Sequence, residues 1–171
     1  PVGSLDGLVN LRQGLCQISG SHLLDVTGEY NTPFIRHLFP DREVEIVTLA
    51  YRTQGLILAS GNPKDIQKIS DIARPSIRFV NRNAGSGTRL WFDSELRKLK
   101  IPTEKINGYD QVVKTHSDAA SAIQSGRADA ALGLQAAAHQ QGLDFIPLFE
   151  ERYDLVLPRE NEKTLMPLLD Y

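Results

Sequence analysis

The residues of this chain best suited to bind an anion lie between positions 79 and 89, in the sequence FVNRNAGSGTR. This segment runs from an apolar stretch through small residues into a stretch with helical spacing. The first N–H groups of a helix have no partners within it, and its dipole places partial positive charge there. Glycines let a ligand approach the backbone, and the hydroxyls of Ser86 and Thr88 can donate hydrogen bonds. The segment therefore predicts an anion-binding loop, to which Gly87 and Arg89 would also contribute.

The same segment also fits an ordinary strand-to-helix turn without a ligand. Ser86 would then be the N-cap, and the glycines would only form the turn. Arg89 favours the anion interpretation, because a cation in the first helical turn is unfavourable unless an anion or an acidic side chain compensates it. The nucleotide-binding motif G-x-G-x-x-G ends at Leu90 instead of glycine, and no P-loop lysine follows Gly87. We therefore expect a small anion rather than a nucleotide.

Ser4 and Ser117 stand at two further predicted helix starts. Each of these helices carries an early aspartate, so ordinary capping explains each serine when it is taken singly. Ligands of open α/β sheets, however, bind beyond the carboxyl ends of the strands, where helix starts gather. We therefore keep both serines as candidate ligand contacts.

His22, His116 and Arg52 lie in or near predicted loops and have several interpretations. Each histidine would be an anion donor, a metal ligand or a loop residue satisfied by its neighbours. Arg52 would reach a ligand or form a surface or hinge ion pair. The four histidines lack zinc-site spacing, and the adjacent His116, Ser117 and Asp118 do not define a catalytic relay. We expect no metal, no cofactor and no catalytic site.

Apolar and helical stretches alternate along the chain, which predicts an α/β fold with a mostly parallel sheet. Strands are expected at residues 16–19, 44–60 with a break near 54–55, 77–81, 128–132, 145–149 and 153–157. Helices are expected at residues 5–13, 33–39, 88–98, 118–124 and 135–141. Gly14 and Gly126 each follow a helix and suit a left-handed C′ position. In the third helix, Asp93 and Arg97 are expected to pair.

Composition places the chain among globular proteins and excludes several partners. The 171 residues carry a formal net charge of −2, which provides no general field that would attract nucleic acid. No apolar run approaches the roughly 20 residues of a membrane span. The first residues lack the pattern of a signal peptide, and the single Cys16 cannot form an internal disulfide. We therefore expect a cytoplasmic domain that itself contacts neither nucleic acid nor a membrane.

The string NRNAGSGTR at positions 81–89 also carries a family resemblance, together with shorter stretches along nearly the whole chain. These are GSLDGL at 3–8, SHLLD at 21–25, YRTQGL at 51–56, GNP at 61–63, TH at 115–116, GRAD at 126–129 and LDFIP at 143–147. With them, the chain resembles the type II periplasmic-binding-protein-like domain attached to bacterial molybdopterin-biosynthesis proteins and helix-turn-helix regulators.

The resemblance implies two small lobes, each with a mostly parallel sheet flanked by helices, and a ligand between them. Residues 1–61 and 143–171 would form the first lobe and residues 62–142 the second, with crossings at 61–63 and Gly142. The helix at Ser4 has no strand before it, which indicates a fragment of a longer polypeptide with a fused helix-turn-helix or molybdopterin-biosynthesis domain.

The ligand that the resemblance implies is a small oxyanion, molybdate or tungstate, sensed or delivered in the cytoplasm. The residues nominated first are Ser4, Ser86, Gly87, Thr88 and Arg89, followed by His22, Arg52, His116 and Ser117.

Three alternatives stay open beside this non-catalytic oxyanion domain. The chain would be an accessory domain of a molybdopterin-biosynthesis enzyme that handles a pterin intermediate, or an effector domain for an organic carboxylate. In the second case, Arg52 or Arg89 would hold the carboxylate through two hydrogen bonds. The third alternative is an interaction domain without a ligand.

Overall fold

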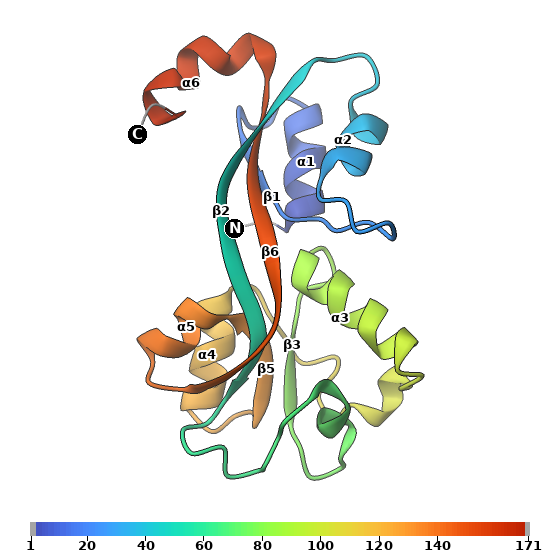
Figure 1. Ribbon diagram of the computed structural model, residues 1–171, viewed down its shortest axis with the longest axis vertical. Coiled ribbons are helices and arrows are strands. Elements are labelled where there is room, and N and C mark those ends of the chain that lie inside the picture. Colours follow the sequence, from blue (N-terminus) through green and yellow to red (C-terminus); the bar gives the residue numbers. More distant parts are fainter. Residues whose placement is uncertain (1–2, 170–171) are drawn as a thin grey trace. The chain divides into compact units, whose positions relative to one another are not determined.

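The computed structural model describes residues 3–169, in which helices and strands alternate (Figure 1). The helices are α1 (Ser4–Arg12), α2 (Thr32–Leu38), α3 (Gly87–Lys98), α4 (His116–Gln124), α5 (Gln135–Gln140) and α6 (Glu162–Leu169). The strands are β1 (Ser19–Ser21), β2 (Val44–Leu58), β3 (Phe79–Arg82), β4 (Val112–Val113), β5 (Ala130–Leu134) and β6 (Asp144–Pro158). Short 3-10 helices are η1 (Ile69–Ala73), η2 (Thr103–Lys105) and η3 (Arg159–Asn161). The α/β class predicted from the sequence is confirmed.

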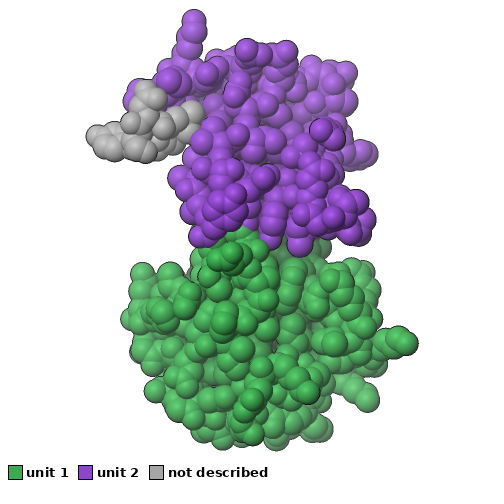
Figure 2. Space-filling view, viewed as in Figure 1, with its two compact units in different colours: residues 1, 52–151 green, residues 2–51, 152–171 purple. Residues whose placement is uncertain are grey.

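The chain divides into two compact units, which Figure 2 colours separately. Unit 1 comprises Arg52–Glu151, and unit 2 comprises the described parts of segments 2–51 and 152–171. The chain passes from one unit to the other within the long strands β2 and β6. The expected crossings at 61–63 and Gly142 lie in turns inside unit 1. A turn signal marks the end of an element, whereas an apolar strand can continue from one core into another.

In unit 1 the strand order is β6-β2-β5-β3-β4. Strand β3 is parallel to β4 and to β5, with Phe79 opposite Ala130. Strand β5 is antiparallel to β2, with Gln54 opposite Leu134. The sheet is therefore mixed rather than mostly parallel. Helical crossovers return the chain in its original direction, so only the strands linked through α3 and α4 run parallel.

Helices cover both faces of the unit 1 sheet (Figure 1). The face under α3 is a large apolar cluster, which includes Leu56, Phe79, Phe92, Leu96 and Leu132. The opposite face packs smaller side chains under α4 and α5, including Ile57, Val80, Ala119, Ala131 and Ala138. Since adjacent strand residues point to opposite faces, these two sets alternate along β2, β3 and β5.

In unit 2, β1 pairs antiparallel with β6, and α1 packs beside β1. The core of this unit contains Leu8, Leu11, Leu23, Ile35, Phe39 and Val156. Asn31 is fully buried at a φ of 59° and ties this core to the sheet. Its amide donates to Asp154 Oδ2 at 2.8 Å and its Oδ1 accepts from Ser21 Oγ at 2.8 Å. This buried polar network fixes the loop that leads into α2.

The break expected in the long strand near 54–55 does not occur, because β2 continues to Leu58. Gly55 instead allows close packing, since a Cβ at this position would lie 2.0 Å from the carbonyl oxygen of Ile146. The two strands expected at 145–149 and 153–157 likewise join into β6. Gly14 and Gly126 have φ angles of 73° and 70°, so the left-handed helix ends predicted for them are confirmed.

Candidate functional site

Three helices of unit 1 begin at one edge of its sheet. Strands β3, β4 and β5 are parallel, and α3, α4 and α5 each begin a few residues after one of them. The helix N-termini therefore gather beyond the carboxyl ends of the strands, where open α/β sheets bind ligands. This edge is the candidate site, and its charged and polar side chains decide what it can hold.

The first turn of α3 presents hydrogen-bond donors that the described protein leaves unused. Ser86 is the N-cap, and its Oγ accepts a hydrogen bond of 3.2 Å from the Arg89 backbone N–H. The backbone N–H groups of Gly87 and Thr88 have no acceptor among the described residues. Thr88 is 1% exposed, and no described group is hydrogen-bonded to its Oγ1. A buried hydroxyl without a partner costs about 1–3 kcal/mol, and a ligand at this position would remove that cost.

Arg82, at the end of β3, brings a buried positive charge to the same edge. Its Nη1 lies 2.9 Å from His116 Nδ1, and its Nη2 donates to the Lys114 carbonyl oxygen at 2.9 Å. No carboxylate of the described residues forms an ion pair with it, and its Nε has no hydrogen-bond partner among them. Burial lowers the pKa of Arg82, while the charges of Asp118 and Glu151 oppose that shift. A buried guanidinium without a carboxylate is suited to an anionic ligand.

Arg89 is engaged by its own helix. Its Nε donates to Asp93 Oδ1 at 3.0 Å, and its guanidinium lies 4.0 Å above the centre of the Tyr109 ring. The Tyr109 hydroxyl also donates to Asp93 Oδ1, at 2.8 Å. The pairing expected between Asp93 and Arg97 is therefore replaced by the pairing with Arg89. The acidic side chain that the sequence required to compensate Arg89 is present, so the position of Arg89 is no evidence for a ligand.

Arg52 forms an ion pair with Glu151. Of the two interpretations of Arg52, a ligand contact or an ion pair, the structure shows the ion pair. Glu151 is 2% exposed and also accepts a hydrogen bond from Gln54 Nε2. Arg52 neutralises a carboxylate that burial would otherwise disfavour, and the Gln54 amide adds a hydrogen bond to it. This cluster lies in unit 1 at the level of Leu134, the last residue of β5.

The start of α4 brings His116, but not Ser117, to the candidate site. Thr115 is the N-cap and exchanges hydrogen bonds with Asp118 in a capping box. Ser117 is exposed, and its carbonyl oxygen accepts from Gln141 Nε2 at 3.4 Å. The helix begins two residues earlier than expected because Thr115, and not the serine, satisfies its first N–H groups.

Ser4 and His22 lie together in unit 2. Gly3 occupies the N-cap of α1, so Ser4 is its first helical residue and not its cap. Ser4 is buried, and its Oγ accepts from the His22 backbone N–H at 3.3 Å. The His22 ring stands 5.8 Å from the ring of Tyr153. Both residues thus belong to a polar group of unit 2, whereas the α3 site lies in unit 1.

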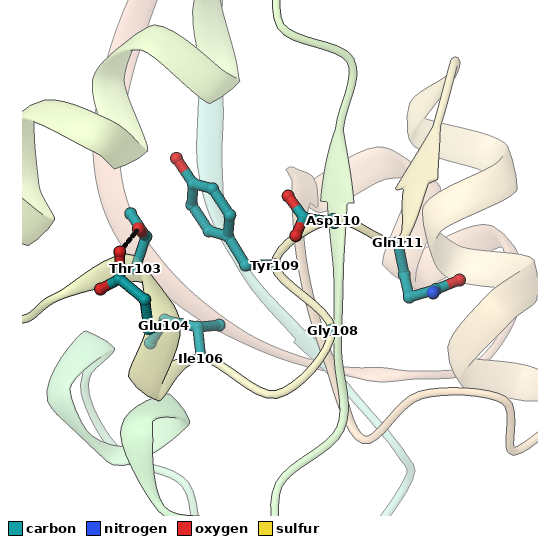
Figure 3. A pocket seen from close by; sticks show the side chains of 7 residues that line it. All are labelled: Thr103, Glu104, Ile106, Gly108, Tyr109, Asp110 and Gln111. Carbon is teal, nitrogen blue, oxygen red and sulfur yellow. Dashed lines mark hydrogen bonds between the residues drawn. The ribbon is translucent and has the colours of Figure 1, made fainter.

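The loop at residues 103–111 lines a pocket of about 360 Å³ in unit 1 (Figure 3). In the view of Figure 3, the carboxylates of Glu104 and Asp110 lie on either side of the Tyr109 ring. The lining residues include these two acids and no lysine or arginine. The pocket therefore does not suit an anion, although Tyr109 links it to Arg89.

The described residues hold no group of three or more histidine, cysteine or carboxylate side chains placed to bind a metal ion. None of the described helices combines the length and the apolar character that crossing a membrane requires.

The fold is that of the type II periplasmic-binding-protein-like class, as the resemblance implied. A family model described as a PBP superfamily domain matches residues 1–170, so the chain belongs to this superfamily. The chain is 41% identical over 164 residues to the Bacillus subtilis (strain 168) protein YvgK, described as uncharacterized. This match covers 95% of the chain and 53% of YvgK, so the chain spans about half of that relative.

Two solved structures show the same fold at low sequence identity. One is a phosphate ABC transporter substrate-binding protein from Clostridium perfringens with bound phosphate, with 16% identity and a TM-score of 0.68 over 94% of this chain and 73% of that one. The other is the CcmR regulatory domain of Synechocystis PCC6803 in complex with 2-PG, with 12% identity and a TM-score of 0.66 over 99% and 77%.

Among the candidate residues, the structure brings Ser86, Gly87, Thr88 and His116 to one sheet edge of unit 1. Sequence reasoning missed Arg82 and Gln54 there. Arg82 stands in the string at positions 81–89 itself, and an arginine at the end of a buried strand is the signal that could have found it. Gln54 carries no comparable signal, because its role depends on Glu151, which lies 97 positions away.

Proposed function

We propose that this chain is a non-catalytic binding or sensing domain for a small oxyanion, which it holds in unit 1 at the first turn of α3. The observation that carries the proposal is the buried Oγ1 of Thr88, which has no hydrogen-bond partner among the described residues. It stands beside two unused backbone N–H groups at the positive end of a helix dipole. These donors and the dipole favour negative charge.

Arg82 supports the same proposal from the end of β3. It supplies a positive charge that no carboxylate of the described residues neutralises directly. Hydrogen bonds to a charged group contribute about 1.5–3 kcal/mol each, and micromolar binding needs about −8 kcal/mol. Micromolar binding therefore needs only a few such hydrogen bonds, and Thr88, the unused amides and Arg82 can donate them.

The candidate ligands are molybdate and tungstate, which the family resemblance nominates, and other small oxyanions. Phosphate and 2-PG are the ligands named for the two structural neighbours. Effector domains for organic carboxylates would require Arg52 or Arg89 as a two-point partner, yet each already pairs with a carboxylate of this chain. We propose further that the domain works in the cytoplasm within a longer polypeptide, coupled to molybdenum-cofactor biosynthesis or transcriptional regulation.

A thermal-shift panel tests the proposal, with molybdate, tungstate, sulfate, phosphate and small carboxylates at matched ionic strength. A ligand that binds only the folded state raises the melting temperature. At a ligand concentration of a hundred times Kd, the free energy of unfolding increases by about 2.7 kcal/mol. At least one oxyanion should raise the melting temperature. No shift with any of them would contradict the proposed function.

The variant Thr88→Val then tests the site. It removes the hydroxyl at nearly constant volume, so anion affinity should fall about tenfold or more. The unliganded protein should be as stable or more stable, because a buried hydroxyl without a partner is gone. Thr103→Val is the matched control, since the Thr103 hydroxyl faces Glu104 on the surface. Equal affinity in Thr88→Val and the wild type would remove the assignment.

A further inference from the structure

Four helices of this chain end in the same hydrogen-bonded motif, in which the residue after the C-cap is left-handed. After α1, α4 and α5 this residue is a glycine, with φ angles of 73°, 70° and 64° at Gly14, Gly126 and Gly142. After α3 it is Lys100, with a φ of 55°. The Lys100 backbone N–H donates to the Arg97 carbonyl oxygen at 3.1 Å, and the next N–H donates to the Leu96 carbonyl oxygen at 2.9 Å. Helix α3 therefore has a lysine where its own end favours a glycine.

Lys100 is unfavourable for the fold at this position. A Cβ is disfavoured in the left-handed region, which glycine, asparagine and aspartate tolerate best. Every other described residue with a positive φ is of one of these three types. The helix dipole does not explain Lys100, because Arg97 and Lys98 already place positive charge in the last turn of α3. A backbone outlier of this kind indicates a role outside the helix.

Lys100 borders an open groove of about 410 Å³ in unit 1. The floor of the groove contains Ala73, Ile101 and Pro102, and the first two of these pack against the apolar cluster under α3. The 12 residues of α3 rise by about 18 Å. Since the groove lies beyond the last of these residues and Thr88 is in the first turn, one small ligand cannot occupy both places.

Three cations surround the apolar floor, and no described carboxylate lines the groove. They are Arg74, Lys100 and Lys105. Both lysines are exposed, and no ion pair among the described residues includes any of the three. The Arg74 side chain is held by hydrogen bonds to three backbone carbonyl oxygens, which leave its charge in place. Because the whole chain has a formal net charge of −2, this positive surface is a local feature.

We propose that the groove docks an acidic segment of a partner protein. One apolar side chain of the segment covers the floor, and its carboxylates meet Arg74, Lys100 and Lys105. Charge complementarity favours an acidic partner. An open groove suits a peptide better than a small molecule, which needs a site that encloses most of its surface. A nucleic acid would supply phosphates but would leave the apolar floor uncovered. Lys100 then stabilises the complex, although it destabilises the free domain.

Fluorescence anisotropy at low salt tests the docking with labelled probes and the whole chain. The probes are the peptide DEELFEED, the peptide DEESGEED, which has the same charge without the apolar pair, and a short oligothymidylate. The wild type should bind DEELFEED about tenfold more tightly than either of the other probes, because only this peptide covers the apolar floor. Added salt should weaken the binding, since the cations are exposed.

Lys100→Gly should change binding and stability in opposite directions. It should weaken DEELFEED binding by about twofold to fivefold, and it should raise the urea midpoint of the free protein. Arg127→Gln is the control for binding, because it removes an exposed charge of the same unit outside the groove. Gly126→Lys is the control for stability. It places a lysine at the equivalent left-handed position after α4, where no atom lies within 4 Å of the added Cβ, so it should lower the urea midpoint.

Three results would overturn the proposal. The first is the absence of DEELFEED binding, and the second is equal binding of DEESGEED or oligothymidylate, which would show attraction by charge alone. The third is an equal loss of DEELFEED affinity in Arg127→Gln and Lys100→Gly. An unchanged or lower urea midpoint in Lys100→Gly would remove the evidence that Lys100 is kept for a partner. The thermal shifts produced by oxyanions should be the same in Lys100→Gly and the wild type, so the docking and the proposed function are tested separately.

Discussion

Arg82 and His116 lie against each other in unit 1, with the Nη1 of Arg82 2.9 Å from His116 Nδ1 and 3.0 Å from Nε2. Arginine only donates hydrogen bonds, so the tautomer of His116 decides which of its ring nitrogens can accept. Arg82 thus supplies a positive charge near the start of α4, and no carboxylate of the described residues is its direct partner. The contact joins β3 to α4 across 34 positions of the chain.

Arg82→Met should weaken oxyanion binding by about tenfold to a hundredfold, because a hydrogen bond to a charged group contributes about 1.5–3 kcal/mol. Arg82→Lys should lie between this variant and the wild type, since lysine keeps the charge but loses the planar fork. Calorimetric titration with the anion that the thermal-shift panel selects measures both. Arg78→Met is the control, because it removes one positive charge at an exposed position paired with Asp129. Equal losses in Arg78→Met and Arg82→Met would mean that only net charge matters.

Asp93→Asn should strengthen oxyanion binding by about twofold to fivefold. The carboxylate of Asp93 neutralises Arg89 in the first turn of α3, and the pair is partly exposed, so its removal changes the local energy by about 0.2–1 kcal/mol. The effect should shrink at high salt, because exposed charges are screened. Glu95→Gln, whose carboxylate pairs with Lys98 near the other end of the helix, serves as the control. A weaker affinity in Asp93→Asn would show instead that Arg89 needs Asp93 to contact the ligand.

Asp129 should make the stability of the protein depend on pH in the acid range. Hydrogen bonds from the Arg78 side chain lower the pKa of Asp129, with a further contribution from the Arg78 backbone N–H. Because the pKa of Asp129 is lower in the folded than in the unfolded state, Asp129 stabilises the folded protein at pH values above its unfolded pKa of about 4. This stabilisation is lost as the pH falls through the folded value.

Urea unfolding at a series of acidic pH values measures this dependence. Asp129→Asn should give a flatter profile than the wild type below about pH 4. Asp110→Asn, at an exposed position of the same unit, is the control for the change of charge. Parallel profiles for Asp129→Asn and the wild type would assign the acid sensitivity to other groups.

Much of α3 could be predicted because its determinants are close together in the sequence. Ser86 is the N-cap as expected, and the observed helix differs from the prediction only by beginning one residue earlier, at Gly87. The left-handed glycines after α1 and α4 are equally local, because the helix end and the glycine conformation are decided within one turn. The strand break expected at Gly55 was wrong for the opposite reason. A glycine is required there by the close approach of the Ile146 backbone, which is far away in the sequence.

The candidate site shows the same division. From the sequence alone, the string at positions 81–89 determined that hydroxyls, glycines and a helix start would meet, since these features follow one another along the chain. Only the tertiary structure decided which of their polar groups are left without partners. Tyr109 joins the local pair of Arg89 and Asp93, Arg82 meets His116, and Gln54 meets Glu151. Burial and pairing depend on which distant segments pack together, and local propensity carries no information about that packing.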